Sequence, residues 1–161
     1  MKTLTQELVK ELFDYRDGEL YWKNAKQGVA KGRKAGNGKI GPYLQVMVNR
    51  KGYNVHRLIA ILHYGDFDGV VDHIDGNTRN NKIENLRIAT REQNSWNAKK
   101  NSKNTTGVKG VSLIKSNKKY QATICIKGKN KNLGQFVLLQ DAKNAVEKAR
   151  RDLHGDFARH V

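Results

Sequence analysis

The stretch from Val71 to Asn97, VDHIDGNTRNNKIENLRIATREQNSWN, decides how this sequence is interpreted. Asp72 and His73 are adjacent, Asn85 follows His73 by twelve residues, and Asn94 comes nine residues later. The set offers one carboxylate, one imidazole and two carboxamides. Together these groups can hold a single hard divalent cation beside a general base, which is what hydrolysis of a phosphodiester requires.

The same stretch predicts a strand, a loop, a second strand and a helix. Residues 71–74 and 86–89 suit the two short strands of a hairpin. Thr90 and Gln93 fit a capping box, with Thr90 as the N-cap and Gln93 at the third helical position. Asn94 is then expected in the first turn of the helix.

This pattern resembles the HNH endonuclease family, whose catalytic core is a ββα-metal element, and especially its phage-type homing and nicking enzymes. Tyr15, the LYW segment at 20–22 and the HRL segment at 56–58 also occur upstream of the motif in many phage nucleases. The resemblance therefore extends over most of residues 1–98. It implies an HNH nuclease domain there, with the ββα-metal core at about 70–98.

The resemblance also implies a role for each motif residue. His73 is the general base, because an imidazole pKa of about 6.5 suits proton transfer at neutral pH. Asp72 and Asn94 are the metal ligands, and their oxygen donors suit one Mg²⁺ or Mn²⁺ ion per site better than Zn²⁺. Asn85 fixes the loop and the orientation of the imidazole. Asn94 stands where the family name has histidine, as in a subset that includes phage homing enzymes.

Plainer interpretations of neighbouring residues stay open. The segment 75–77, Asp-Gly-Asn, is interpreted as the connection of a hairpin, and Asn80 and Asn81 as loop-forming residues. His56 is interpreted as a structural histidine, whereas Arg57 is a candidate contact for a phosphate.

The formal net charge of +16 over 161 residues favours a polyanionic partner, with nucleic acid ahead of an anionic membrane. No apolar run approaches the roughly 20 residues of a membrane span, and the polar N-terminus is unlike a signal peptide. We therefore expect a soluble protein of the cytoplasm, that of the bacterial host if a phage encodes it. Cys125 is the only cysteine, so neither an internal disulfide nor a structural zinc site is expected.

The positive charge is concentrated in the C-terminal part. Residues 99–161 hold 15 Lys and Arg against 4 Asp and Glu, a net charge of +11, which leaves +5 for residues 1–98. Lysines outnumber arginines 21 to 10. Lysine binds phosphate as a point charge, whereas arginine is the side chain that usually binds guanine through two hydrogen bonds. The excess of lysine therefore favours binding to the DNA backbone over recognition of the base sequence.

Apolar spacing and turn residues predict several small elements before the motif. The first is a helix with the apolar stripe Leu4, Leu8, Val9, Leu12 and Phe13 and with Thr3 or Thr5 as its N-cap. A turn at Asp17–Gly18, a strand at 20–22 and an irregular basic loop at 23–41 follow it. Strands at 43–48 and 53–56 around a turn at 49–52 come next, and then a helix at about 57–64 that stops at Gly65.

After the motif, residues 99–107 contain no aliphatic or aromatic side chain and are expected to be a linker. The expected elements that follow are strands near 110–115, 120–127 and 132–137 and a helix at 141–154 with the apolar stripe Ala142, Ala145, Val146, Ala149 and Leu153. A three-stranded antiparallel sheet with one helix resembles the AP2 DNA-binding domain. The matching segments are GV at 110–111, YQATI at 120–124, LGQF at 133–136 and DAKNAVEKA at 141–149. The fold class is therefore expected to be α+β, with an AP2-like domain over 108–161.

The AP2 resemblance implies DNA contact through the sheet, but the arginines that plant members place on the DNA-facing strands are missing. Their positions and an acidic one are taken by Ser112, Ile114, Cys125 and Thr123. The polar residues that remain are the DNA-binding candidates, together with Arg57 from the N-terminal part: Lys109, Lys115, Lys119, Gln121, Lys127 and Gln135. Binding through phosphates, only loosely selective for sequence, is expected.

The sequence thus predicts a metal-dependent endonuclease acting on double-stranded DNA, with a homing or nicking role. One active site per chain favours a monomer that nicks. The alternative is a DNA-binding protein that keeps a degenerate HNH scaffold, holds DNA without metal and never cuts it. A third interpretation is a nuclease directed at RNA or at branched DNA.

Overall fold

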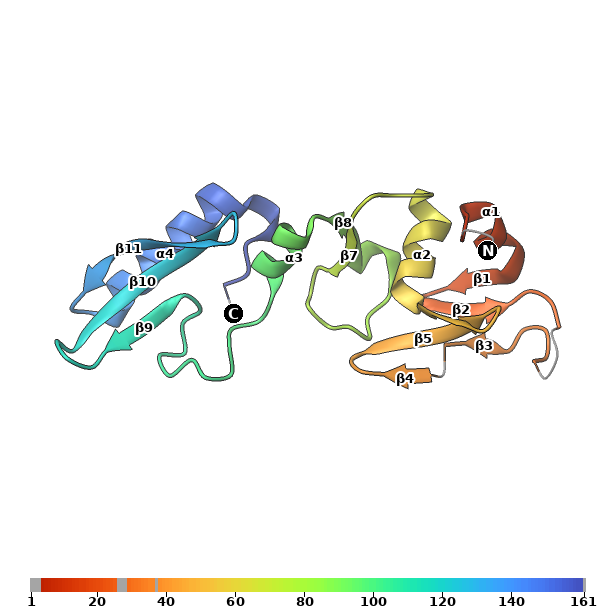
Figure 1. Ribbon diagram of the computed structural model, residues 1–161, viewed down its shortest axis with the longest axis horizontal. Helices are drawn as coiled ribbons and strands as arrows, with labels where there is room; N and C mark the ends of the chain where they lie inside the picture. The colour runs from red at the N-terminus through yellow and green to blue at the C-terminus, as the bar shows by residue number, and fades with distance from the viewer. Residues whose placement is uncertain (1–3, 26–28, 37, 161) are drawn as a thin grey trace. The chain divides into compact units, whose positions relative to one another are not determined.

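The computed structural model describes residues 4–25, 29–36 and 38–160. The chain divides into two compact units, the N-terminal unit (Met1–Ala89) and the C-terminal unit (Thr90–Val161). Both combine helices with small antiparallel sheets (Figure 1), so the chain is mixed helix and sheet, as predicted.

The described residues of the N-terminal unit form three small sheets and two α-helices. The strand orders are β1-β2-β3, β4-β5-β6 and β7-β8. The elements are α1 (Gln6–Leu12), β1 (Phe13–Arg16), β2 (Glu19–Trp22), β3 (Lys34–Ala35), β4 (Gly38–Ile40), β5 (Tyr43–Val48), β6 (Lys51–Asn54), α2 (Val55–Tyr64), β7 (Val70–His73), the 3₁₀ turn η1 (Ile83–Asn85) and β8 (Leu86–Ala89).

The first helix and the first hairpin form where local signals predict them. Thr5 is the N-cap of α1, and its hydroxyl accepts a hydrogen bond from the Leu8 amide at 3.4 Å. Asp17 and Gly18 have φ values of 46° and 85°, the left-handed pair that a tight hairpin turn needs. Phe13 was predicted as the end of the helical stripe but begins β1, where it is buried and its ring centroid lies 4.6 Å from that of Trp22.

One prediction for the middle of this unit was wrong, and another was right except for where the helix begins. The segment 23–41 is not wholly irregular, because β3 pairs with β2 and β4 pairs with β5. Backbone hydrogen bonds between strands do not depend on side-chain polarity, so a composition rich in Lys, Gly and Asn gave no sign of them. The helix predicted at 57–64 begins earlier, at Val55, which is buried together with Leu58 and Ile59 on one helix face.

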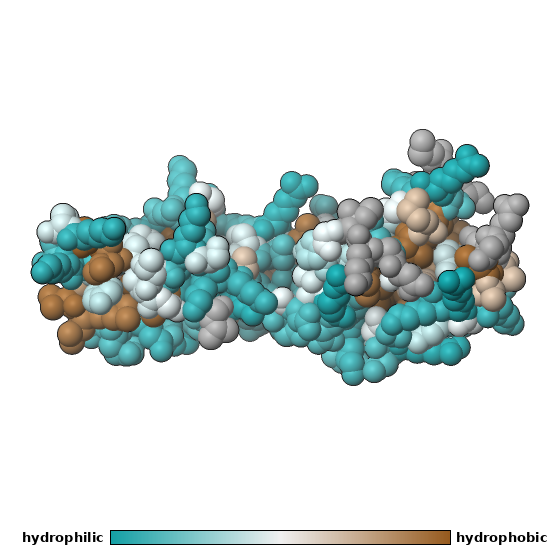
Figure 2. Space-filling view, turned by 90° about the horizontal axis from the view of Figure 1, so that it is seen from below, coloured by the Kyte–Doolittle hydropathy of each residue, from teal (hydrophilic) through white to brown (hydrophobic). Residues whose placement is uncertain are grey.

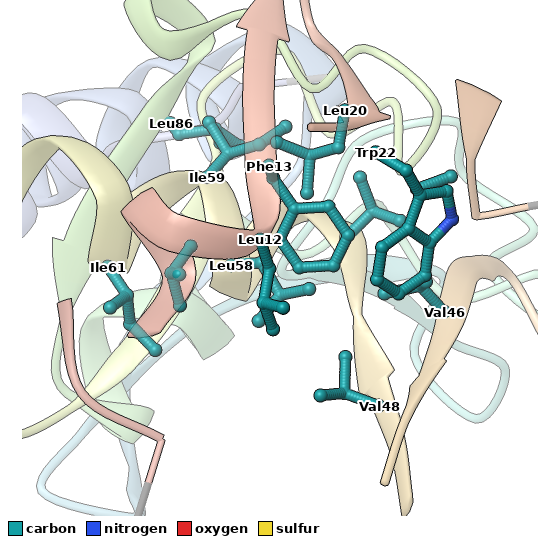
Figure 3. Close-up of a cluster of buried hydrophobic side chains, with 13 residues drawn as sticks. Leu12, Phe13, Leu20, Trp22, Val46, Val48, Leu58, Ile59, Ile61 and Leu86 are labelled. Atoms are coloured by element: carbon teal, nitrogen blue, oxygen red, sulfur yellow. The ribbon is translucent and has the colours of Figure 1, made fainter. Parts of the chain in front are cut away.

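The core of the N-terminal unit gathers side chains from α1, α2 and the strands around them. Figure 3 shows Phe13 and Trp22 close to aliphatic side chains from β2, β5, α2 and β8. Leu20, Leu58 and Ile59 are fully buried. Leu86 of β8 belongs to the same cluster, so the hairpin that carries Asp72 and His73 is anchored to this core.

The C-terminal unit consists of a short helix and a three-stranded sheet with a longer helix packed on it. The strand order is β11-β10-β9. The elements are α3 (Arg91–Asn97), β9 (Val111–Ile114), β10 (Lys119–Ile126), β11 (Lys129–Phe136), α4 (Leu139–His154) and the 3₁₀ turn η2 (Gly155–Phe157). The predicted linker 99–107 makes defined contacts within the unit, since the Asn104 and Thr106 side chains hydrogen-bond to the carbonyl oxygen of Val111 at 3.0 and 2.9 Å. The sequence-based domain limits at 98 and 108 stay a prediction.

One face of this sheet packs on α4, as the alternation in β10 predicted. Ala122 and Val111 are buried against Ala142 and Val146 of the helix. The stripe predicted on α4 was wrong at Leu153, which is 47% exposed. The buried face instead continues at four-residue spacing through Arg150 and His154, so two polar side chains occupy positions that a hydrophobic stripe would fill.

The visible surface is mostly hydrophilic, and Figure 2 shows apolar residues gathered in one region over the C-terminal unit. The exposed large apolar side chains of this unit include Leu113, Val137 and Leu138. Within the described ranges, no helix is both long enough and apolar enough to cross a membrane.

Candidate active site

The hairpin of β7 and β8 positions Asp72 and His73. The two strands pair antiparallel, with Asp72 opposite Arg87 and His73 opposite Leu86. The Asp72 and His73 side chains are only 3% and 5% exposed. Burial of these two polar residues in a short hairpin requires polar partners, and the structure supplies them.

Asp72 forms an ion pair across the hairpin. The Arg87 Nε donates to the Asp72 Oδ2 at 2.8 Å, and the two side chains are 18% and 4% exposed. The Asp72 carboxylate is thus buried as one partner of an ion pair.

The imidazole of His73 is held by Asn81. The His73 Nε2 and the Asn81 Oδ1 lie 2.9 Å apart, and Asn81 is 2% exposed. A carboxamide oxygen can only accept, so the contact requires the proton on Nε2 and places the lone pair of the neutral ring on Nδ1. Asn81 was predicted only as a loop residue, and its contact with His73 is a role that the sequence analysis missed.

Asn85 fixes the loop between the two strands, as the resemblance implies. Its Oδ1 accepts from the Asp75 amide at 3.0 Å, and its Nδ2 donates to the Asp75 Oδ1 at 3.0 Å and to the Asn80 carbonyl oxygen at 2.7 Å. Burial tends to raise the pKa of Asp75, but hydrogen bonds from Asn80, Asn77 and Asn85 outweigh it and hold that pKa below its ordinary value. The loop is thus braced by an ionised carboxylate, and Asn81, not Asn85, contacts the imidazole.

The first hairpin braces the same loop from outside. Gly18 approaches so closely that an added Cβ would lie 2.9 Å from the Lys82 amide nitrogen. The Lys82 ammonium pairs with the Asp17 carboxylate at 2.8 Å, and the Tyr15 hydroxyl accepts from the Ile83 amide at 3.0 Å. Tyr15 is one of the residues that carry the resemblance to the HNH family, and its bond to the Ile83 amide gives a physical reason for a tyrosine at this position.

Two further rings lie beside His73. The His56 ring centroid is 5.0 Å from that of His73 in an edge-to-face arrangement, and the Tyr43 ring lies 4.8 Å from His56 and 6.2 Å from His73. Burial, followed by the proximity of His73 and Arg57, lowers the pKa of His56 to about 4. His56 is therefore a neutral ring at physiological pH.

Asn94 lies on α3, whose start has the predicted capping box. The Thr90 hydroxyl accepts from the Gln93 amide at 3.1 Å, and the Gln93 Oε1 accepts from the Thr90 amide at 2.8 Å. Asn94 is half-buried. Its carboxamide makes no side-chain hydrogen bond within the described part of the chain, which leaves its oxygen available to a ligand.

Contacts within the C-terminal unit hold α3 in place. Trp96 stacks on His154, with ring centroids 4.2 Å apart and planes 6° from parallel. The Lys109 ammonium donates to the carbonyl oxygens of Trp96 and Ala98 at 2.6 and 2.5 Å. Burial, followed by the charges of Arg150 and Arg159, lowers the pKa of Lys109 to about 8. Lys109 was a candidate for DNA contact, but its ammonium is engaged inside the unit.

The outer face of the C-terminal sheet carries the remaining candidates. Gln121 lies in register with Ser112 on one side and with Gln135 on the other, and Lys119 pairs with Ile114. The Asn117 amide donates to the Gln135 Oε1 at 3.2 Å. The other exposed candidates are Lys115, which follows β9, and Lys127, in the turn between β10 and β11.

Arg57 is exposed on α2 in the N-terminal unit. Its Nη1 donates to the Gly69 carbonyl oxygen at 3.2 Å, and its guanidinium lies 4.8 Å from the centre of the Phe67 ring. These contacts orient the side chain without neutralising its charge.

The oxygen donors of Asp72 and Asn94 are of the type that Mg²⁺ and Mn²⁺ bind. Among the described residues, no three His, Cys, Asp or Glu side chains gather as a metal site. Asp72 of the N-terminal unit and Asn94 of the C-terminal unit thus offer one carboxylate and one carboxamide of the kind that a hard cation binds.

Comparison with known proteins supports the family resemblance. Residues 53–96 match a family described as HNH endonuclease. The chain is 42% identical over 89 residues to Protein 3.8 of Escherichia phage T7, covering 55% of this chain and 73% of that protein. It is 35% identical over 91 residues to an uncharacterized HNH endonuclease of Acanthamoeba polyphaga mimivirus, covering 56% of this chain and 46% of that protein. No solved structure gives a significant match.

Proposed function

This chain belongs to the same family as Protein 3.8 of Escherichia phage T7 and carries an HNH endonuclease domain, and from this premise we propose that it is a metal-dependent DNA endonuclease. The observation that supports the proposal most is the buried imidazole of His73, whose proton is held on Nε2 by Asn81. An imidazole fixed in one tautomer is prepared to accept a proton on its other nitrogen.

In the proposed reaction, His73 Nδ1 takes a proton from the water molecule that attacks phosphorus. The bond between phosphorus and the 3′ oxygen breaks, and the leaving oxygen takes a proton from solvent water, which gives a 3′-hydroxyl and a 5′-phosphate. Asp72 and Asn94 are the residues that would hold Mg²⁺ or Mn²⁺, and such a cation, when bound, stabilises the charge that develops on the leaving oxygen. Asn85 and Asp75 keep the intervening loop in one conformation.

DNA is held, in this proposal, by phosphate contacts spread over both units. Arg57 contributes from the N-terminal unit. The C-terminal sheet and its turns contribute the half-buried Gln121 and four exposed residues, Lys115, Lys119, Lys127 and Gln135. Each lysine that neutralises a phosphate adds about 0.9 to the slope of log affinity against log salt, so the three lysines add about 3. The AP2-like interpretation of this unit is part of the proposal.

A cleavage assay on supercoiled plasmid and phage DNA tests the proposal. We expect conversion to nicked circles with Mg²⁺ or Mn²⁺ and none with EDTA, since one chain provides one active site. His73→Ala should bind DNA but lose turnover. Cleavage that persists in EDTA, or in the His73→Ala variant at the wild-type rate, would contradict the proposed chemistry.

A DNA-binding protein without catalysis is the second candidate, and the ion pair of Asp72 with Arg87 favours it. A carboxylate already neutralised by a guanidinium attracts a metal less than a free one does. Tight, salt-sensitive binding without any metal-dependent product, on DNA that includes the natural target, would establish this second function.

A further inference from the structure

Three aromatic rings from three different elements meet at the candidate base. Tyr43 comes from β5, His56 from the first turn of α2 and His73 from the end of β7. The His56 ring lies nearest to His73, at 5.0 Å between centroids and 65° between planes. Tyr43 lies 4.8 Å from His56, and its plane is 22° from that of His73. The imidazole thus has two ring neighbours in addition to its hydrogen-bond partner Asn81.

We propose that His56 is a positioning residue that holds the imidazole of His73 in its reactive orientation. The inference rests on the function proposed above and assigns His56 a part in it. The hydrogen bond from His73 Nε2 to Asn81 fixes one atom of the ring. A second constraint is needed to fix the ring plane, and the edge-to-face contact with His56 provides it.

The contact acts through the shape of the ring and not through hydrogen bonding. His56 is 7% exposed, and its contacts with His73 and Tyr43 are contacts between rings. Its low pKa keeps it uncharged beside His73 at neutral pH.

Three variants separate ring contact from other roles. His56→Ala removes the ring, and His56→Phe keeps a ring without nitrogens. The matched control is His63→Ala on the same helix, because His63 is exposed and its ring packs against Tyr15 at 4.7 Å. If the positioning inference is correct, His56→Ala lowers kcat by about tenfold to a hundredfold, the usual effect of a misplaced catalytic group, with little change in KM. His56→Phe restores kcat, and His63→Ala cuts at the wild-type rate.

A measurement without DNA or metal follows His73 directly. The ¹⁵N shifts of the His73 ring distinguish a proton on Nε2 from one on Nδ1. We expect a single Nε2–H form in the wild type and in His56→Phe, and a mixture or broadened signals in His56→Ala. Thermal unfolding checks each variant, and His56→Gln replaces His56→Ala if the latter does not fold.

Two results would overturn the inference. One is wild-type cleavage by the ring-free variant with unchanged His73 signals. The other is a folded His56→Phe that is as slow as His56→Ala, because His56 would then act through its nitrogens. A wild-type protein that never cuts DNA, but whose His73 signals change only when the ring of His56 is removed, would support the positioning role and overturn the proposed nuclease function.

Discussion

Gly18 should be essential for the loop that holds the candidate base, although it lies more than fifty residues away from that loop in the chain. Its φ of 85° is in the left-handed region. An added Cβ would lie 2.9 Å from the Lys82 amide nitrogen and 3.1 Å from the Asn81 carbonyl carbon, both backbone atoms. Gly18→Ala therefore has to displace the backbone at Asn81, the residue that binds His73.

The size of the effect follows from two costs. A left-handed conformation costs a residue with a Cβ about 1–2 kcal/mol, and overpacking against backbone adds about 1–3 kcal/mol. We expect Gly18→Ala to lower the free energy of unfolding of the N-terminal unit by about 2–5 kcal/mol. Gly32 is the matched control, because its φ is 77° and a Cβ added there would meet no heavy atom within 4 Å. Gly32→Ala should lose only the conformational part, about 1–2 kcal/mol.

Urea unfolding monitored by Trp22 fluorescence in a Trp96→Phe background measures the loss in this unit. Metal-dependent nicking by the same proteins measures displacement of the site, and we expect Gly18→Ala alone to be slow under conditions where both variants are folded. Equal losses of stability for Gly18→Ala and Gly32→Ala, with equal cleavage rates, would refute the argument that Gly18 braces the loop.

Three other predictions concern the Asn81 contact, the titration of His56 and the support of α3. Asn81→Ala leaves the Nε2 proton of His73 buried without its acceptor, which should cost about 1–3 kcal/mol of stability and reduce kcat; Asn81→Asp, which keeps an acceptor oxygen, should recover folding in urea titrations. The pKa of His56 is about 4 in the folded protein against 6.5 when unfolded, so the unfolded state binds the proton first and stability falls as pH drops from 6.5 to 4. The full loss is on the order of 3 kcal/mol, and a His56→Phe variant whose unfolding keeps the same pH dependence would contradict this. Finally, the fragment 1–107 lacks the residues that hold α3, so Trp96 should become solvent-exposed with red-shifted emission, whereas an unshifted spectrum would show that α3 is stable by itself.

Much of the candidate site could be predicted because its signals are local. The Asp72–His73 pair, the two strands around it and the capping box at Thr90 depend on neighbours within a few residues, and the structure contains all of these elements. Asn85 was expected to fix the loop, and its bonds to Asp75 do so. Short-range hydrogen bonds and turn preferences depend on residues that are close together in the sequence, so the sequence alone can indicate them.

The contacts that were missed depend on which side chains meet in space. Asn80 and Asn81 are the same residue type side by side in the sequence, yet Asn81 binds the imidazole and Asn80 donates to Asp75. Only the path of the loop, set in part by Gly18, distinguishes them. Lys109 was counted with the DNA-binding lysines because charge is visible in the sequence, whereas the carbonyl oxygens that surround its ammonium are not.

The helix α3 depends on the rest of the C-terminal unit for its stability. A helix of seven residues is not stable alone, because nucleation costs more than so few hydrogen bonds return. Its stability comes from the C-terminal unit, where Lys109 binds its last carbonyl oxygens, Trp96 stacks on His154 and Glu92 accepts the Lys127 amide. If Asn94 holds the metal, as proposed, the ligand is presented by an element that the rest of the C-terminal unit keeps folded. Changes in the C-terminal unit should then alter metal dependence as well as DNA affinity, even where they touch neither metal nor DNA.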